Sequence, residues 1–167
     1  MKILPLLAAA VLLGGCSQTA APSQPVCAGT GPFQAVVYLE QDGREGRGIL
    51  RREEGELSLL LEEPREVDGL SFVQKEGEGL TLAMGELSFS LPPDSLPACA
   101  PFRMMEEALE QAALVPLEQQ EDGSLAAKGS CSAGEFVLWA KEDGKFLRLE
   151  VSAESFTVEF ENVQFSP

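Results

Sequence analysis

Residues 80–91 read LTLAMGELSFSL, and this stretch decides the fold. Its apolar side chains stand at every second position on either side of Gly85-Glu86, at Leu80, Leu82, Met84, Leu87, Phe89 and Leu91. Such alternation is typical of two antiparallel strands that share one apolar face. Pro92-Pro93 then ends the pattern, because proline has no N–H to donate to a neighbouring strand.

The apolar spacing changes beyond these prolines. In residues 101–114 (PFRMMEEALEQAAL) the apolar side chains stand three or four positions apart, at Phe102, Met105, Leu109 and Ala112. This spacing predicts an amphipathic helix, and Pro101 suits its first turn. We expect Glu106, Glu107 and Glu110 to face away from the core.

Strand patterns also flank this region. Before it, we expect strands at residues 33–40 and 48–52 and further strands through two groups of apolar positions: Leu57, Leu59 and Leu61, then Leu70 and Phe72. After Pro116 the alternation returns around the hairpin signals Asp122-Gly123 and Asp143-Gly144. The inward positions there are Phe136, Leu138, Phe146, Leu149, Phe156, Val158 and Phe160. The sequence therefore predicts about ten strands and one helix.

A sheet of this length must curl or be covered, because a flat sheet with an exposed apolar face and open edges aggregates. The single helix is the available cover. We therefore predict a mainly β protein with one helix, in which a strongly curved antiparallel sheet forms a half-open β-barrel with the helix on its concave side. A closed barrel or a β-sandwich is the alternative.

Composition excludes several classes of function. The chain has 167 residues, enough for one domain, with 12 Lys and Arg against 27 Asp and Glu, a formal charge of −15. This charge disfavours nucleic acid as a partner. The absence of histidine excludes Ser-His-Asp and Cys-His catalysis. The acidic clusters lack the Asp-x-Asp-x-Asp-Gly spacing of a calcium loop, so we expect no metal site. Because histidine and catalytic motifs are both missing, we expect no enzyme and no cofactor.

The N-terminus has the pattern of a signal peptide. Lys2 precedes an apolar run at residues 3–13 that is too short to span a membrane. The run ends in Leu13-Gly14-Gly15-Cys16, which resembles the lipobox of bacterial lipoproteins. The resemblance implies signal peptidase recognition through Leu13, Gly14 and Gly15, and acyl chains such as palmitate on Cys16. An ordinary secretory signal that contains a cysteine is the alternative.

These features predict three segments. Residues 1–15 are a signal peptide, residues 16–32 are a lipidated N-terminus with a flexible tether, and residues 33–167 are a single β-rich domain. The lipobox resemblance implies a cell-envelope protein, anchored by lipid to the extracytoplasmic side of the cell membrane or the outer membrane. Three cysteines remain besides Cys16, namely Cys27, Cys99 and Cys131, and either Cys27–Cys99 or Cys99–Cys131 is a possible disulfide.

Four pieces of the sequence resemble the LolA/LolB group of bacterial lipoprotein carriers, namely residues 61–64, 67–72, 80–82 and 85–91. The resemblance implies an unclosed β-barrel with a hydrophobic cavity between sheet and helix that holds acyl chains. The sequence before residue 33 predicts no counterpart of the helix that this group has before its first strand, and we expect that an anchored chain would not shuttle. Both departures favour a receptor-like or structural role.

The expected cavity is lined by apolar side chains of the strands and the helix: Leu59, Leu61, Phe72, Leu82, Met84, Phe89, Met105, Leu109, Leu138 and Phe156. The first hypothesis is a membrane-anchored lipoprotein that binds a lipid or another hydrophobic ligand without catalysis. The alternative is a structural or interaction lipoprotein, whose core is filled and whose sheet edge binds a protein partner of unknown identity. Residues 129–134 (GSCSAG) only superficially resemble a nucleophile elbow and are expected to be a turn.

Overall fold

The computed structural model describes residues 31–92 and 95–166. In this part of the chain, eleven strands form one antiparallel sheet, where about ten were expected, and there is one α-helix and two short 3-10 helices. The elements are β1 (Phe33–Gln41), β2 (Arg44–Glu53), β3 (Glu56–Glu63), η1 (Arg65–Val67), β4 (Ser71–Lys75), β5 (Leu80–Met84), β6 (Leu87–Leu91), α1 (Pro101–Ala112), β7 (Glu118–Gln119), β8 (Leu125–Cys131), β9 (Gly134–Ala140), β10 (Phe146–Val151), η2 (Ser152–Glu154) and β11 (Phe156–Phe165).

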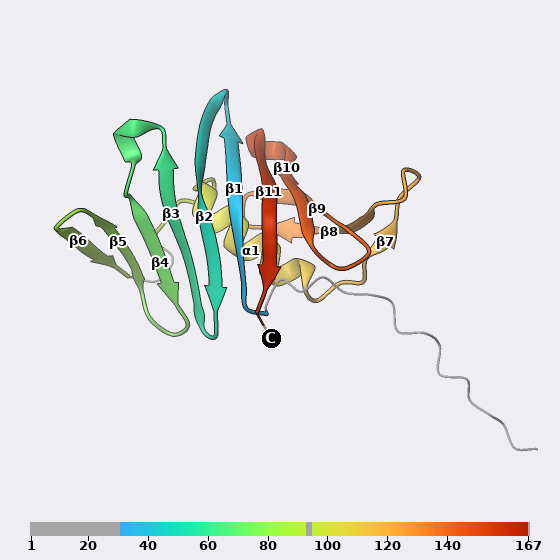
Figure 1. Ribbon diagram of the computed structural model, residues 1–167, viewed down its shortest axis with the longest axis horizontal. Coiled ribbons are helices and arrows are strands. Elements are labelled where there is room, and N and C mark those ends of the chain that lie inside the picture. Colours follow the sequence, from blue (N-terminus) through green and yellow to red (C-terminus); the bar gives the residue numbers. More distant parts are fainter. Residues whose placement is uncertain (1–30, 93–94, 167) are drawn as a thin grey trace, which may run out of the picture.

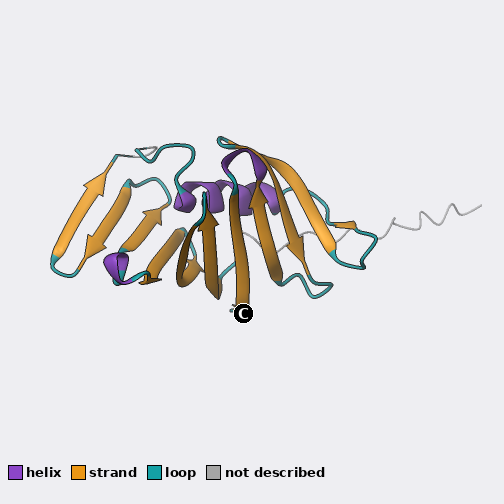
Figure 2. Cartoon of the chain, turned by 90° about the horizontal axis from the view of Figure 1, so that it is seen from above, coloured by secondary structure: helices purple, strands orange, loops and turns teal. Residues whose placement is uncertain are grey.

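The sheet is open. Its strand order is β6-β5-β4-β3-β2-β1-β11-β10-β9-β8-β7, so among the described residues β6 and β7 stand at opposite ends and do not pair. The first and last strands meet in the middle of the sheet. The sheet curves around α1, which lies on its concave side (Figures 1 and 2). The predicted half-open, mainly β fold is confirmed, rather than the closed barrel or sandwich.

The core lies between α1 and the central strands. The four apolar residues expected on the inner face of the helix are all buried, and Met104 and Ala108 are buried with them. The helix contacts β8 and β9. At the centre of the sheet, the rings of Phe33 and Phe146 meet edge to face with centroids 5.1 Å apart, a favourable geometry for aromatic pairs.

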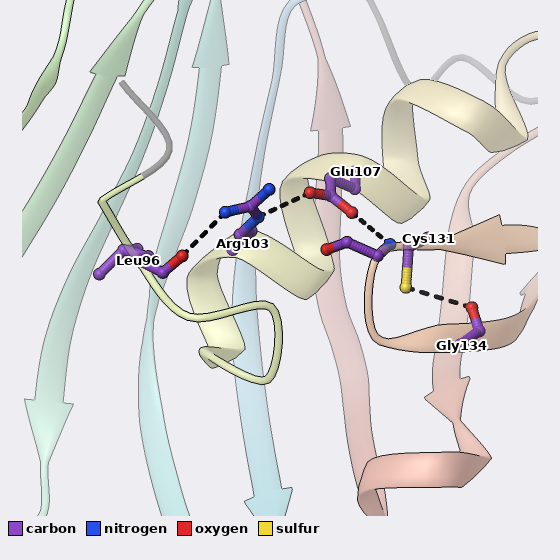
Figure 3. A network of polar contacts seen from close by, with 6 residues as sticks. Leu96, Arg103, Glu107, Cys131 and Gly134 are labelled. Atoms are coloured by element: carbon purple, nitrogen blue, oxygen red, sulfur yellow. Dashed lines mark hydrogen bonds and ion pairs between the residues drawn. The ribbon is translucent and has the colours of Figure 1, made fainter. Parts of the chain in front are cut away.

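Polar contacts hold the helix on both sides (Figure 3). Arg103 donates from Nη1 to the Leu96 carbonyl oxygen at 2.8 Å and from Nε to Glu107 at 2.7 Å. The other Glu107 oxygen accepts the Ser132 N–H at 2.6 Å. Glu107 therefore joins α1 to the β8–β9 turn.

The GSCSAG segment contains the expected turn, at Ser132 and Ala133, between two strands. Strand β8 ends at Cys131 and β9 begins at Gly134. The Cys131 thiol donates to the Gly134 carbonyl oxygen at 3.4 Å. Cys99 and Cys131 are both free, so the proposed Cys99–Cys131 disulfide is not present, while Cys27 lies outside the described residues. No helix in residues 31–92 and 95–166 has the length and apolar character to cross a membrane.

Candidate functional site

One row of side chains crosses six strands on the concave face. Each member stands opposite the next in the strand register: Ala35, Leu50, Leu59, Phe72, Leu82 and Phe89. The first three are buried, Phe72 and Leu82 are half-buried, and Phe89 is 61% exposed. We call this set the concave row. The row is therefore buried at the centre of the sheet and exposed at β6.

The corresponding row on the other half of the sheet behaves differently. Ala127, Leu138, Leu149 and Val158 stand opposite one another from β8 to β11, and all four are fully buried. The helix lies over this half and the centre, while β4, β5 and β6 extend beyond it (Figure 1). The helix therefore covers the concave face from β8 to the centre of the sheet, whereas Phe72, Leu82 and Phe89 on β4 to β6 are half-buried or exposed.

The helix cover ends at Phe102, in its first turn. The Phe102 ring stacks on Phe72 of β4, with centroids 5.5 Å apart and planes at 17°. Beyond this pair, Met84, Leu87 and Phe89 are 44%, 63% and 61% exposed. Exposed apolar side chains that cluster in this way are typical of interaction or ligand-binding surfaces.

A cavity of about 700 Å³ lies beside this boundary. We call it the apolar cleft. Five segments form it: the β1–β2 hairpin, strand β3 with η1, strand β4, the chain that leads into the first turn of α1, and the start of β11. Its lining is Leu39, Gln41, Asp42, Arg44, Glu45, Gly46, Leu59, Leu61, Glu63, Pro64, Val67, Phe72, Cys99, Ala100, Pro101, Phe102 and Phe156. Apolar side chains form its interior, and the charged residues come from the hairpin and the end of β3.

The residues expected to line a cavity fall into three groups. Leu59, Leu61, Phe72 and Phe156 line the apolar cleft. Leu82, Met84 and Phe89 lie on β5 and β6, outside the cleft lining and half-buried or exposed. Met105, Leu109 and Leu138 are fully buried, because helix and sheet pack directly on each other there.

Several lining residues were missed, including Leu39, Val67 and Phe102. Leu39 lies in the strand predicted at residues 33–40, and Phe102 belongs to the predicted apolar stripe of the helix. Their place at the cleft depends on where the helix ends on the sheet, and this contact joins residues far apart in sequence. Leu13, Gly14, Gly15 and Cys16 lie outside the described residues.

A hydrogen bond links two sides of the cleft. Gln41 at the end of β1 donates from Nε2 to the Cys99 carbonyl oxygen at 3.1 Å. Both residues line the cleft, and they are 58 positions apart in sequence. This contact ties the β1–β2 hairpin to the segment that leads into α1.

A separate polar pocket of about 220 Å³ lies on another side of the helix and shares only Phe102 with the cleft lining. Its charged residues are Arg103, Glu106, Glu107 and Glu110. Burial, together with the nearby carboxylate of Glu110, raises the pKa of Glu106 to about 7. Burial alone would raise the pKa of Glu107, but the Ser132 N–H and Arg103 outweigh it and lower that pKa.

Arg52 of β2 lies beside these acids. Its Nη1 is 3.9 Å from a Glu110 oxygen, and only 11% of its side chain is exposed. Burial lowers the pKa of Arg52 despite the nearby carboxylates. Glu106 and Glu110 therefore both interact electrostatically with one largely buried cation.

No protein-family model and no curated protein matches the sequence. The chain is similar to the crystal structure of an uncharacterized conserved protein from Thermus thermophilus, with a TM-score of 0.51 at 12% identity over 82% of this chain and 80% of that one. It is also similar to a LolA superfamily protein from Nitrosomonas europaea (TM-score 0.43, 9% identity, 85% and 89% covered). An outer membrane lipoprotein-sorting protein domain from Vibrio parahaemolyticus has a TM-score of 0.40 at 14% identity, with 84% and 87% covered. The Thermus protein shares the fold of this chain.

Proposed function

We propose that this protein binds an apolar ligand, such as the acyl chain of a lipid, in the apolar cleft and along the open part of the concave row, without catalysis. The observation that carries the proposal is the rise in exposure from Leu59 to Phe89 beside a cavity of about 700 Å³. Cavities of about 300–1,000 Å³ with apolar walls are typical of sites for small molecules.

The energetics favour such a ligand. An acyl chain laid along Phe72, Leu82 and Phe89 would remove these half-buried and exposed side chains from water. Each buried methylene contributes about 0.8 kcal/mol, so a chain of several methylenes binds measurably even after the entropy of association is subtracted. The cleft also offers polar groups at one end only, which suits an amphiphile better than a fully apolar molecule.

The experiment compares two neighbouring residues of β3. Leu61 lines the cleft, whereas Leu60 lies between two inward-facing residues and is 41% exposed on the opposite face. Leu61→Trp should fill part of the cleft and weaken binding of the neutral fluorescent probe N-phenyl-1-naphthylamine about tenfold. Leu60→Trp should leave binding unchanged. Equal binding by both variants and the parent would refute a ligand site in the cleft.

Native mass spectrometry gives an independent measure. Full-length protein purified from a lipid-containing host should carry a bound mass of several hundred daltons that leaves on denaturation. A ligand-free mass, with no uptake when lipids are added, would contradict the proposal.

We further propose that the protein is a lipoprotein anchored through Cys16 after cleavage at Leu13-Gly14-Gly15, on the extracytoplasmic side of the cell membrane or the outer membrane. The support is the lipobox pattern of the sequence. Cells given an alkyne analogue of palmitate should label the protein. Cys16→Ala should abolish labelling, whereas the matched variant Cys27→Ala should retain it.

The second candidate function is binding of a protein partner at the edge of the sheet. Strand β6 stands at one end of the sheet and its five residues, LSFSL, carry no charge. Natural sheets usually protect such edges with charged side chains. This candidate predicts that a partner cross-linked to the protein in cells is lost in Ser90→Lys, while probe binding in the cleft stays unchanged.

A further inference from the structure

The charged residues that line the apolar cleft, which we call its mouth, are mostly acidic. Asp42, Glu45 and Glu63 contribute three carboxylates to its lining, and among the described residues Arg44 contributes the one cation. All four residues are exposed, so a ligand head group at the mouth would meet them in water. The formal charge of this mouth is −2.

A neighbouring hollow strengthens the negative field. It shares Leu39, Glu45, Gly46, Glu63 and Pro64 with the cleft and adds the carboxylates of Glu40 and Glu159. Its cation, Arg47, is ion-paired with Glu62 at 2.7 Å. The field of the whole chain, with its formal charge of −15, has the same sign, and fields of one sign select ligands of the opposite sign.

From this arrangement we infer that the cleft binds an amphiphile with a positively charged head group, whose apolar tail occupies the cleft and whose head lies between the β1–β2 hairpin and the end of β3. The inference rests on the proposed function, because it names the class of ligand for the same cleft. Fatty acid anions, whose carboxylate would face three carboxylates and one arginine, are disfavoured.

The test compares probes with one tail and three head groups. Dodecyltrimethylammonium, dodecyl maltoside and dodecanoate, each below its micelle concentration, are titrated into the full-length protein by calorimetry. The cationic probe should bind about tenfold tighter than the anionic probe at low salt. Raising the ionic strength to about 0.5 M should reduce this ratio to near one, because exposed charges are screened.

Two triple variants that remove the same number of negative charges test whether the carboxylates of the mouth cause the preference for the cationic probe. Asp42→Asn/Glu45→Gln/Glu63→Gln removes the carboxylates of the mouth and should bring the cation-to-anion ratio to about threefold or less. Glu118→Gln/Glu121→Gln/Glu142→Gln removes three exposed carboxylates on β7 and in two turns that do not line the cleft, and should retain the parent ratio. The urea midpoint of each variant verifies that it folds.

Each outcome decides between the two proposals. Equal binding of all three probes, or tighter binding of dodecanoate, would overturn the head-group inference and leave the apolar site standing. An equal loss of preference in both triple variants would assign the selectivity to the whole-chain field and overturn the role of the mouth. If no probe binds, the proposed function itself fails.

Discussion

Phe72 of β4 and Phe102 of α1 stack with ring centroids 5.5 Å apart and planes at 17°. The pair marks the limit of the helix cover. Phe102 is 2% exposed and belongs to the core, whereas Phe72 is half-buried and lines the apolar cleft together with it. We therefore expect stability to depend mainly on the covered part of one continuous apolar face, and the proposed ligand binding mainly on its open part.

The first prediction compares the same change, phenylalanine to alanine, at one site in the covered part and one site in the open part. Phe102→Ala should lower the free energy of unfolding by about 3 kcal/mol or more, because a buried ring is lost and a cavity remains. Phe89→Ala should change it by less than about 1 kcal/mol, because 61% of this side chain is already exposed. Urea unfolding of both variants measures the difference, and equal costs would contradict the division of the concave face.

The second prediction uses Cys99 as a reporter for the cleft. Cys99 is exposed and lines the cleft, whereas Cys131 is half-buried in the β8–β9 hairpin and donates to Gly134. A bound amphiphile should slow the reaction of Cys99 with a maleimide several-fold by covering the thiol. Peptide mass spectrometry follows both cysteines in one sample, and the rate at Cys131 should not change. Equal slowing at both sites would indicate a global effect of the ligand.

The third prediction concerns the contact that holds the helix to the β8–β9 turn. Glu107→Ala removes the acceptor of the Ser132 N–H and of Arg103, so it should destabilise the fold by about 1–2 kcal/mol. Because these partners lower the pKa of Glu107 below 4.5, its contribution should be present above pH 4.5 and disappear as pH falls below it. Glu118→Ala, at an exposed residue of β7, is the control and should have little effect.

The strand alternation and the helix stripe predicted most of the fold. Leu80, Leu82 and Phe89 were placed on one apolar face, and the register confirms that they share it. How much of the concave face the helix covers was not predictable. The alternation of apolar residues along a strand shows which side chains share a face, but not which other element packs on that face. Leu138 and Phe89 both stand at inward-facing positions of their strands, yet Leu138 is fully buried and Phe89 is mostly exposed.

The polar pocket is a second feature that the sequence patterns could not predict. Arg52 follows Leu50 on the inward-facing positions of β2, so the alternation placed a cation on the concave face. The helix pattern placed Glu106 and Glu110 away from the core. Only the docking of α1 over β2 brings these groups together, and that docking depends on contacts between residues distant in sequence.

The fourth prediction is a stability change with pH that comes from Glu106. Its pKa is about 7 in the folded protein, compared with 4.5 for an ordinary glutamate, so the folded state holds the proton more tightly than the unfolded state. Folding is therefore favoured below pH 4.5 and loses stability as pH rises from 4.5 to 7. After allowance for solvent screening of a half-buried group, the loss should be about 1–2 kcal/mol.

Glu106→Gln should remove this loss, and the difference between variant and parent cancels the other carboxylates that titrate in the same range. Glu110→Gln is the matched control on the next turn of the helix. It removes a carboxylate that raises the pKa of Glu106, so the loss should persist but be smaller and be complete at a lower pH. Urea unfolding at several pH values measures both variants. Parallel curves for Glu106→Gln and the parent between pH 4.5 and 7 would show that Glu106 ionises as freely in the folded chain as in water.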